Sequence, residues 1–150
     1  MGSWREQALI DAPVQDVWDL VGDPRRYPEW VSEDWIEVTG LPTVEKGARF
    51  EQVTAVPYGD PARTTFEIEE LDELREIRLR CTESGWYSRF VLTEAEGATF
   101  ADVEIGMDPT TPEAAEIDAT EGKRWYRKVA QHAIDGVKRT LGARGEKPAS

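Results

Sequence analysis

The chain has 150 residues and a formal net charge of −12 at pH 7. A chain of this length fits one domain with its own core, for which six Trp, four Phe and four Tyr are available. The acidic excess argues against nucleic acid as a partner, because phosphates require clustered Lys and Arg. No apolar run approaches the roughly 18 residues of a membrane span, so we expect no membrane span.

The first three predicted elements are a strand and two short helices. Residues 4–11 alternate between apolar and polar side chains, as in a strand. Pro13 suits the first turn of a helix, where its missing N–H is not needed. The helix has one apolar stripe at i, i+3, i+4 and i+7, made of Val14, Val17, Trp18 and Val21. Residues 22–24 end it, and residues 25–30 predict a second short helix or turn.

From about residue 34 to residue 108 the hydrophobic period changes from 3.6 to 2. This pattern predicts six meandering strands, each apolar on one face, as in an antiparallel sheet with one solvated side. Thr111 and Pro112 look like the cap and first turn of a helix. A long amphipathic helix is predicted beyond Gly122, and its continuity through this glycine stays open. Its apolar stripe is Tyr126, Val129, Ala130, Ala133, Val137 and Leu141.

Cys81 and His132 are the only cysteine and the only histidine. A lone cysteine forms no disulfide within the chain, which is typical of a reducing compartment. The first ten residues lack the basic start and apolar stretch of a signal peptide. We therefore expect a cytoplasmic protein. We expect no cofactor and no metal, since neither a nucleotide-binding motif nor metal-ligand spacing appears. Cys81 is interpreted as a small core residue and His132 as a solvated surface residue.

The order of these elements matches that of the helix-grip proteins, and several motifs strengthen the likeness. The motifs are residues 10–18 (IDAPVQDVW), Asp23-Pro24, residues 27–30 (YPEW), Lys46-Gly47 before Phe50, Leu92, and Gly97-Ala98-Thr99. On these the chain resembles the START / Bet v 1-like (SRPBCC) superfamily, and within it the polyketide cyclase/dehydrase and lipid-transport family. The resemblance implies an α+β fold in which a curved antiparallel sheet of about seven strands wraps around a long C-terminal helix. Residues 1–142 would form this single domain, and residues 143–150 a polar tail.

The resemblance also implies a mostly apolar cavity, because a strongly bent sheet cannot lie flat against one helix. Strand alternation and the helix stripe supply the residues that would face it, although any one of them would fit a closed core equally well. The candidate ligand-binding residues are Trp30, Phe50, Gln52, Thr54, Tyr58, Phe66, Ile68, Leu79, Cys81, Trp86, Ser88, Phe90, Tyr126, Val129, Ala130 and Ala133. Gln52, Thr54, Ser88 and Tyr126 would orient a guest, or the first three would pair with polar neighbours across strands.

Three functions remain open at this stage. The first is a binding protein for a small hydrophobic or aromatic molecule, lipid- or polyketide-like. The second is an enzyme that cyclises or dehydrates a polyketide, with Tyr126, Ser88 and Gln52 as candidates, although no catalytic constellation is visible in the sequence. The third is a protein-interaction module that resembles chaperone-regulating relatives and uses its acidic sheet surface. The sequence predicts neither the ligand nor the oligomeric state.

Overall fold

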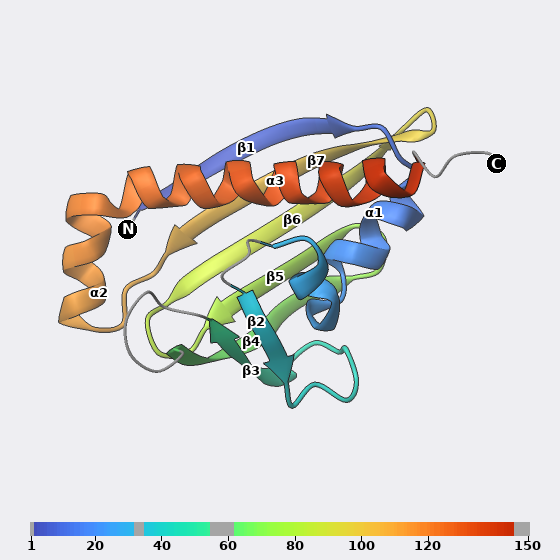
Figure 1. Cartoon of the computed structure of the whole chain (residues 1–150). Helices are drawn as coiled ribbons and strands as arrows, with labels where there is room; N and C mark the ends of the chain where they lie inside the picture. The colour runs from blue at the N-terminus through green and yellow to red at the C-terminus, as the bar shows by residue number, and fades with distance from the viewer. Residues whose placement is uncertain (1, 32–34, 55–61, 146–150) are drawn as a thin grey trace.

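The computed structural model describes residues 2–31, 35–54 and 62–145, and it confirms the predicted fold class. A seven-stranded antiparallel sheet curves around a long C-terminal helix (Figure 1). In chain order the elements are β1 (Gly2–Ile10), α1 (Val14–Val21), the 3₁₀ helix η1 (Pro24–Glu29), β2 (Trp35–Thr39), β3 (Arg49–Thr54), β4 (Ala62–Asp72), β5 (Glu76–Cys81), β6 (Trp86–Ala95), β7 (Ala98–Met107), α2 (Pro112–Ile117), the π-helical turn η2 (Asp118–Gly122) and α3 (Lys123–Gly145).

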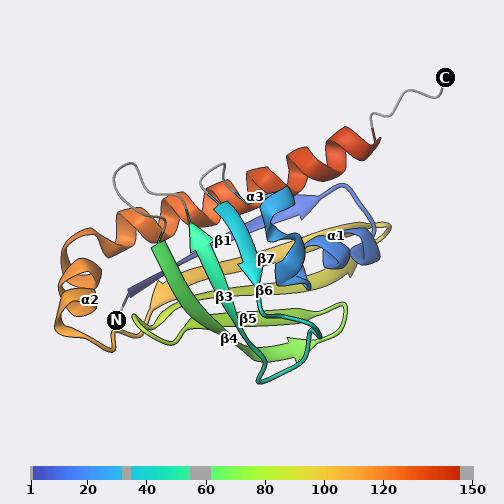
Figure 2. The ribbon, with the colours of Figure 1, turned by 60° about the horizontal axis from the view of Figure 1, so that its bottom comes forward.

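The strands lie in the order β1-β7-β6-β5-β4-β3-β2. Strands β2 to β7 form a meander, whereas β1 pairs with β7, the last strand along the chain, with Leu9 opposite Phe100. Figures 1 and 2 show α3 lying along the concave face of the sheet, with α1 and η1 beside its C-terminal half. The sheet and α3 therefore form two layers, with α1 and η1 closing one end of the space between them.

Side-chain alternation gives the sheet one apolar and one charged face. The buried residues Ala101, Val103 and Ile105 line the inner face of β7. The outer face carries cross-strand ion pairs, among them Arg49–Glu67 at 3.0 Å and Arg89–Glu76 at 2.8 Å. Exposed pairs of this kind contribute at most about 1 kcal/mol each, so burial of the inner face against α3 dominates the packing energy.

The C-terminal helical region changes direction before it reaches the sheet. The Thr111 hydroxyl accepts a hydrogen bond from the Ala114 N–H at 3.1 Å and caps α2. Through η2 the chain turns, so that α2 points away from the axis of α3 (Figure 1). Thus the helical path continues through Gly122, but as a π-helical bend. Helix α3 then reaches Gly145, so the boundary predicted at residue 142 falls inside a helix. In the described part of the chain, no helix combines the length and apolar composition needed to cross a bilayer.

The segment η1 packs closely against α3 because Gly136 leaves room for it. A Cβ atom at Gly136 would lie 1.9 Å from the Trp30 carbonyl oxygen, so only glycine fits while the backbone stays in place. The Trp30 indole N–H donates to the Leu20 carbonyl at 3.1 Å, which fixes the ring to α1. These contacts set the position of η1 at the end of the space between sheet and helix.

Candidate ligand-binding site

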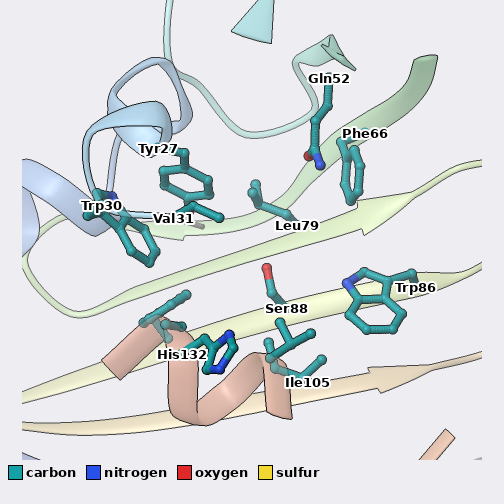
Figure 3. Close-up of a pocket in the computed structure, with 13 residues that line it drawn as sticks. Tyr27, Trp30, Val31, Gln52, Phe66, Leu79, Trp86, Ser88, Ile105 and His132 are labelled. Carbon is teal, nitrogen blue, oxygen red and sulfur yellow. The ribbon is translucent and has the colours of Figure 1, made fainter. Parts of the chain in front are cut away.

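A cavity of about 150 Å³ lies between the sheet and α3 (Figure 3). Its described walls come from η1, Val31, β3 to β7 and α3. The lining residues are Tyr27, Trp30, Val31, Gln52, Phe66, Leu79, Trp86, Ser88, Phe90, Ile105, Val129, His132 and Ala133. All are hydrophobic except Gln52, Ser88 and His132, and none of these described residues is Asp, Glu, Lys or Arg. The cavity is therefore an apolar space with a few polar groups, inside a strongly acidic protein.

Aromatic rings form one wall of the cavity and are packed edge to face. The ring centroids of Tyr27 and Trp30 lie 4.8 Å apart, and those of Trp30 and Phe90 lie 5.7 Å apart. The Tyr27 hydroxyl donates to the Val21 carbonyl at 2.9 Å, on the side of α1. Burial, with a smaller effect from Asp23, raises the pKa of Tyr27, so this hydroxyl stays protonated. Because the polar atoms of Tyr27 and Trp30 are bound to backbone carbonyls of α1, these rings offer the cavity mainly carbon surface.

Three polar groups that border the cavity have no hydrogen-bond partner among the described residues. Trp86 and Ser88 lie two residues apart on β6, so both side chains lie on the inner face of the sheet. Figure 3 shows the Ser88 hydroxyl and the indole nitrogen of Trp86 pointing into the cavity. No described residue hydrogen-bonds to either group, nor to the imidazole of His132 on α3. Trp86 and Ser88 are half-buried and His132 is exposed, so water can reach these groups while the cavity holds no guest. A guest that covers them without offering an acceptor would cost about 1–3 kcal/mol for each donor that it buries.

Nine of the candidate residues from the sequence line this cavity. They are Trp30, Gln52, Phe66, Leu79, Trp86, Ser88, Phe90, Val129 and Ala133. Another five are buried in the surrounding core without lining it: Phe50, Ile68, Cys81, Tyr126 and Ala130. The Phe50 ring, for example, stacks on Phe66 at 5.9 Å and supports it. The side chain of Thr54 and the whole of Tyr58 lie outside the described residues.

Tyr126 offers its hydroxyl to the protein and not to the cavity. The hydroxyl donates to the Asp118 carboxylate at 2.5 Å, and the Gly2 N–H donates to the same oxygen at 2.9 Å. The ring packs edge-on against Trp86, with centroids 5.5 Å apart. The π-helical turn brings Asp118 to this place, eight residues before Tyr126. The expected polar contact between Tyr126 and a guest is thus replaced by an anchor between η2, α3 and β1.

Four lining residues were not among the sequence candidates: Tyr27, Val31, Ile105 and His132. His132 is exposed, as expected for a residue outside the apolar stripe, yet its ring also borders the cavity (Figure 3). The helical spacing could have identified His132 as a lining residue. It lies in a second stripe of the helix, in which Val129, His132, Ala133 and Gly136 follow the spacing i, i+3, i+4 and i+7. Ile105 continues the alternation of β7, whereas η1 and Val31 have no periodicity that would identify them.

The comparisons with known proteins agree with this architecture. The model of a family described as polyketide cyclase / dehydrase and lipid transport matches residues 1–142, and no curated protein matches the chain. Similar solved structures include a START superfamily protein from Mycobacterium smegmatis, with 14% identity, a TM-score of 0.67 and 97% of each chain covered. An AHSA1-like protein from Aeromonas hydrophila has 18% identity and a TM-score of 0.65, with 99% of each chain covered. A protein from Arthrobacter aurescens has 19% identity and a TM-score of 0.70, with 99% of this chain and 88% of that chain covered.

At these identities the structural similarities show the fold alone. The family match extends over nearly the whole chain and confirms the resemblance inferred from the motifs. The chain belongs to the polyketide cyclase/dehydrase and lipid-transport family.

Proposed function

We propose that the chain binds a small hydrophobic or aromatic molecule in the cavity between the sheet and α3. The observation that carries the proposal is the cavity itself, whose described wall is apolar apart from Gln52, Ser88 and His132. Concave apolar sites with a few convergent polar groups are the usual form of small-molecule sites in proteins. Membership of a family whose description includes polyketide chemistry and lipid transport supports this function.

The size of the cavity favours a compact guest. Its volume of about 150 Å³ equals that of an engineered cavity in another protein that binds benzene. A one-ring aromatic molecule would therefore enter without repacking of the walls. A long acyl chain would require the surrounding side chains to move.

Native mass spectrometry of the purified protein, followed by extraction under denaturing conditions, tests the proposal directly. We expect a small molecule at one copy per chain that is released on unfolding, and its mass will identify its chemical class. Titration of the unliganded protein with acetophenone gives a second test by isothermal calorimetry. A protein that is isolated empty and binds no aromatic probe contradicts the proposal.

Blocking the cavity should abolish binding without unfolding the protein. Ala133 lines the cavity from α3, so Ala133→Trp places an indole in the space of the guest. We expect at least a tenfold loss of acetophenone affinity by calorimetry. Lys138→Trp adds the same side chain at an exposed position of α3 and serves as the control. Equal affinity in both variants would show that the guest binds elsewhere.

Catalysis in the same cavity is a second candidate function. Ser88 and His132 both line it, and a hydroxyl and an imidazole are groups that transfer protons in enzymes. Of the residues predicted from the sequence for this role, Ser88 and Gln52 border the cavity and Tyr126 does not. Conversion of a poly-β-ketone analogue by the wild type, lost in Ser88→Ala/His132→Ala, would support an enzyme. Undiminished turnover in this double variant would exclude the assignment.

The third interpretation, a protein-interaction module, would use the outer face of the sheet. There many described carboxylates are already paired with arginines, as in Arg63–Glu51 at 2.7 Å and Arg78–Glu69 at 3.1 Å. These pairs neutralise much of the acidic surface, so no feature of the described face favours this function over binding.

A further inference from the structure

We infer that the cavity selects an aromatic guest that carries a hydrogen-bond-accepting oxygen, as in an aryl ketone, an enol or a carboxylate. The inference rests on the proposed function and defines the chemical class of the guest. It follows from three groups that border the cavity, Trp86 and Ser88 on β6 and His132 on α3, which are together called the donor wall.

Trp86 is the strongest member of the donor wall. An indole N–H donates and cannot accept, so only an acceptor satisfies it. No acceptor for it exists among the described residues, although the ring is half-buried. The orientation of the ring is fixed by its edge-on contact with Tyr126, whose hydroxyl is held in turn by Asp118. Packing therefore directs the N–H into the cavity (Figure 3).

Ser88 and His132 extend the donor wall from two different elements. Side chains two residues apart on a strand are separated by about 6.6 Å along it, so Ser88 and Trp86 reach neighbouring atoms of one guest. His132 borders the same space from α3 and carries an N–H in either neutral tautomer. A single carbonyl or carboxylate group, placed between β6 and α3, would satisfy two of these donors at once.

Several buried polar side chains of the described chain donate their hydrogen bonds to acceptors within the protein. Tyr27 and Trp30 line the cavity as well, and each donates to a backbone carbonyl of α1. The buried Thr99 hydroxyl donates to the Ala12 carbonyl at 2.8 Å. These buried groups thus have acceptors within the protein, whereas the Trp86 N–H and the Ser88 hydroxyl have none among the described residues. The latter two are therefore the groups that can donate to a guest.

The described lining of the cavity is unfavourable for a cationic guest. The described lining contains no carboxylate, although the protein carries 30 Asp and Glu residues. An ammonium group would lose its hydration without gaining a counter-ion, which is unfavourable. A neutral or anionic oxygen meets donors in the same place.

Acetophenone and α-methylstyrene form a matched pair of probes, because they differ only in a carbonyl oxygen against a methylene group. We expect acetophenone to bind about three- to tenfold more tightly by calorimetry, as one or two hydrogen bonds allow. Trp86→Phe and Ser88→Ala should each narrow this difference. Thr93→Ala removes a hydroxyl from an exposed position of the same strand and should leave it unchanged.

NMR of the ¹⁵N-labelled protein gives a readout that a purely structural role of Trp86 would not produce. Acetophenone should move the indole N–H resonance of Trp86 downfield, and α-methylstyrene should not; Trp86→Phe assigns the signal. Dispersed spectra of the variants check their folding, and the wild-type shift decides the question even where Ser88→Ala unfolds.

The outcomes separate this inference from the proposed function. Equal affinity for the two probes, or benzylammonium binding as tightly as acetophenone, overturns the acceptor inference and leaves cavity binding intact. Binding of neither neutral probe overturns both. For benzoate, His132→Ala should lower the affinity about threefold or more, and the neighbouring Gln131→Ala should not. Equal benzoate affinity in these two variants would show that His132 does not donate to the guest.

Discussion

The side chain of Tyr126 joins three segments that are distant in the sequence. Its hydroxyl contacts Asp118 in η2, its ring contacts Trp86 in β6, and Asp118 also accepts the N–H of Gly2 in β1. Burial raises the pKa of Tyr126, and the hydrogen bond to Asp118 raises it further, so the hydroxyl remains a donor at physiological pH. This network serves the stability of the fold and holds the indole of the donor wall in place.

Tyr126→Phe should therefore weaken the fold more than it weakens binding. Loss of a hydrogen bond to a charged partner lowers the free energy of unfolding by about 1.5–3 kcal/mol, whereas the phenyl ring still supports Trp86. Urea unfolding measures the first effect and calorimetry with acetophenone the second, which we expect within about twofold of the wild type. A large loss of affinity in a variant of undiminished stability would place the hydroxyl in the binding site.

At the scale of elements, α3 is fastened to the rest of the molecule at its start and again just past its middle. Near its start, η2 is bound to β1 through Asp118 and Gly2. Further along, Gly136 lies directly against the backbone of Trp30 at the end of η1. The cavity lies between these two fastenings, so its width depends on both of them.

The Gly136 contact can be tested against a second glycine in the same helix. In Gly136→Ala the new Cβ atom would meet the Trp30 carbonyl, and the shift of η1 should cost about 1–3 kcal/mol. At Gly142 nothing lies within 4 Å of the added atom, so Gly142→Ala should stabilise α3 by up to about 1 kcal/mol. In both thermal and urea unfolding we expect Gly136→Ala to be less stable than the wild type and Gly142→Ala to be more stable. A neutral Gly136→Ala would show that η1 moves freely.

The fastening through Asp118 should depend on pH. Burial raises the pKa of this carboxyl, but the hydrogen bonds that it accepts, those from Tyr126 and Gly2 among them, outweigh burial and hold the pKa below its ordinary value. Because the unfolded-state pKa is about 3.9 and the folded-state pKa is lower, the ionised form contributes its full stabilisation above about pH 5. That contribution is lost as the pH falls through the folded-state pKa.

We accordingly expect wild type to be more stable than Asp118→Asn near neutral pH, and the difference to shrink below about pH 4. Urea unfolding at a series of pH values measures it. Asp135→Asn changes an exposed carboxylate of α3 and provides the comparison. If the difference in stability between the wild type and Asp118→Asn does not change with pH, the substitution acts through packing and not through loss of the carboxylate charge.

At the scale of the whole molecule, the periodic parts of the sequence predicted the architecture and much of the cavity. Alternation placed Phe66 and Ser88 on the inner face of the sheet, and the helix stripe placed Val129 opposite them. Two features depend on geometry that no repeat encodes. One is the π-helical turn at residues 118–122, which directs the Tyr126 hydroxyl away from the cavity. The other is the irregular segment around η1, whose packing against α3 is visible only once the fold is known.

The pairing of the first strand with the last also has a consequence for how the protein is made. Strand β1 leaves the ribosome before the other elements of the domain, and its partner β7 begins only at Ala98. At translation rates of roughly 5–20 residues per second, β1 waits on the order of 5–20 s for its hydrogen-bonding partner. During that time its backbone groups and the apolar side chain of Ile10, which is buried in the folded protein, are open to other nascent chains and to chaperones. The sheet, and with it the cavity, closes only after synthesis has passed the end of β7 at Met107.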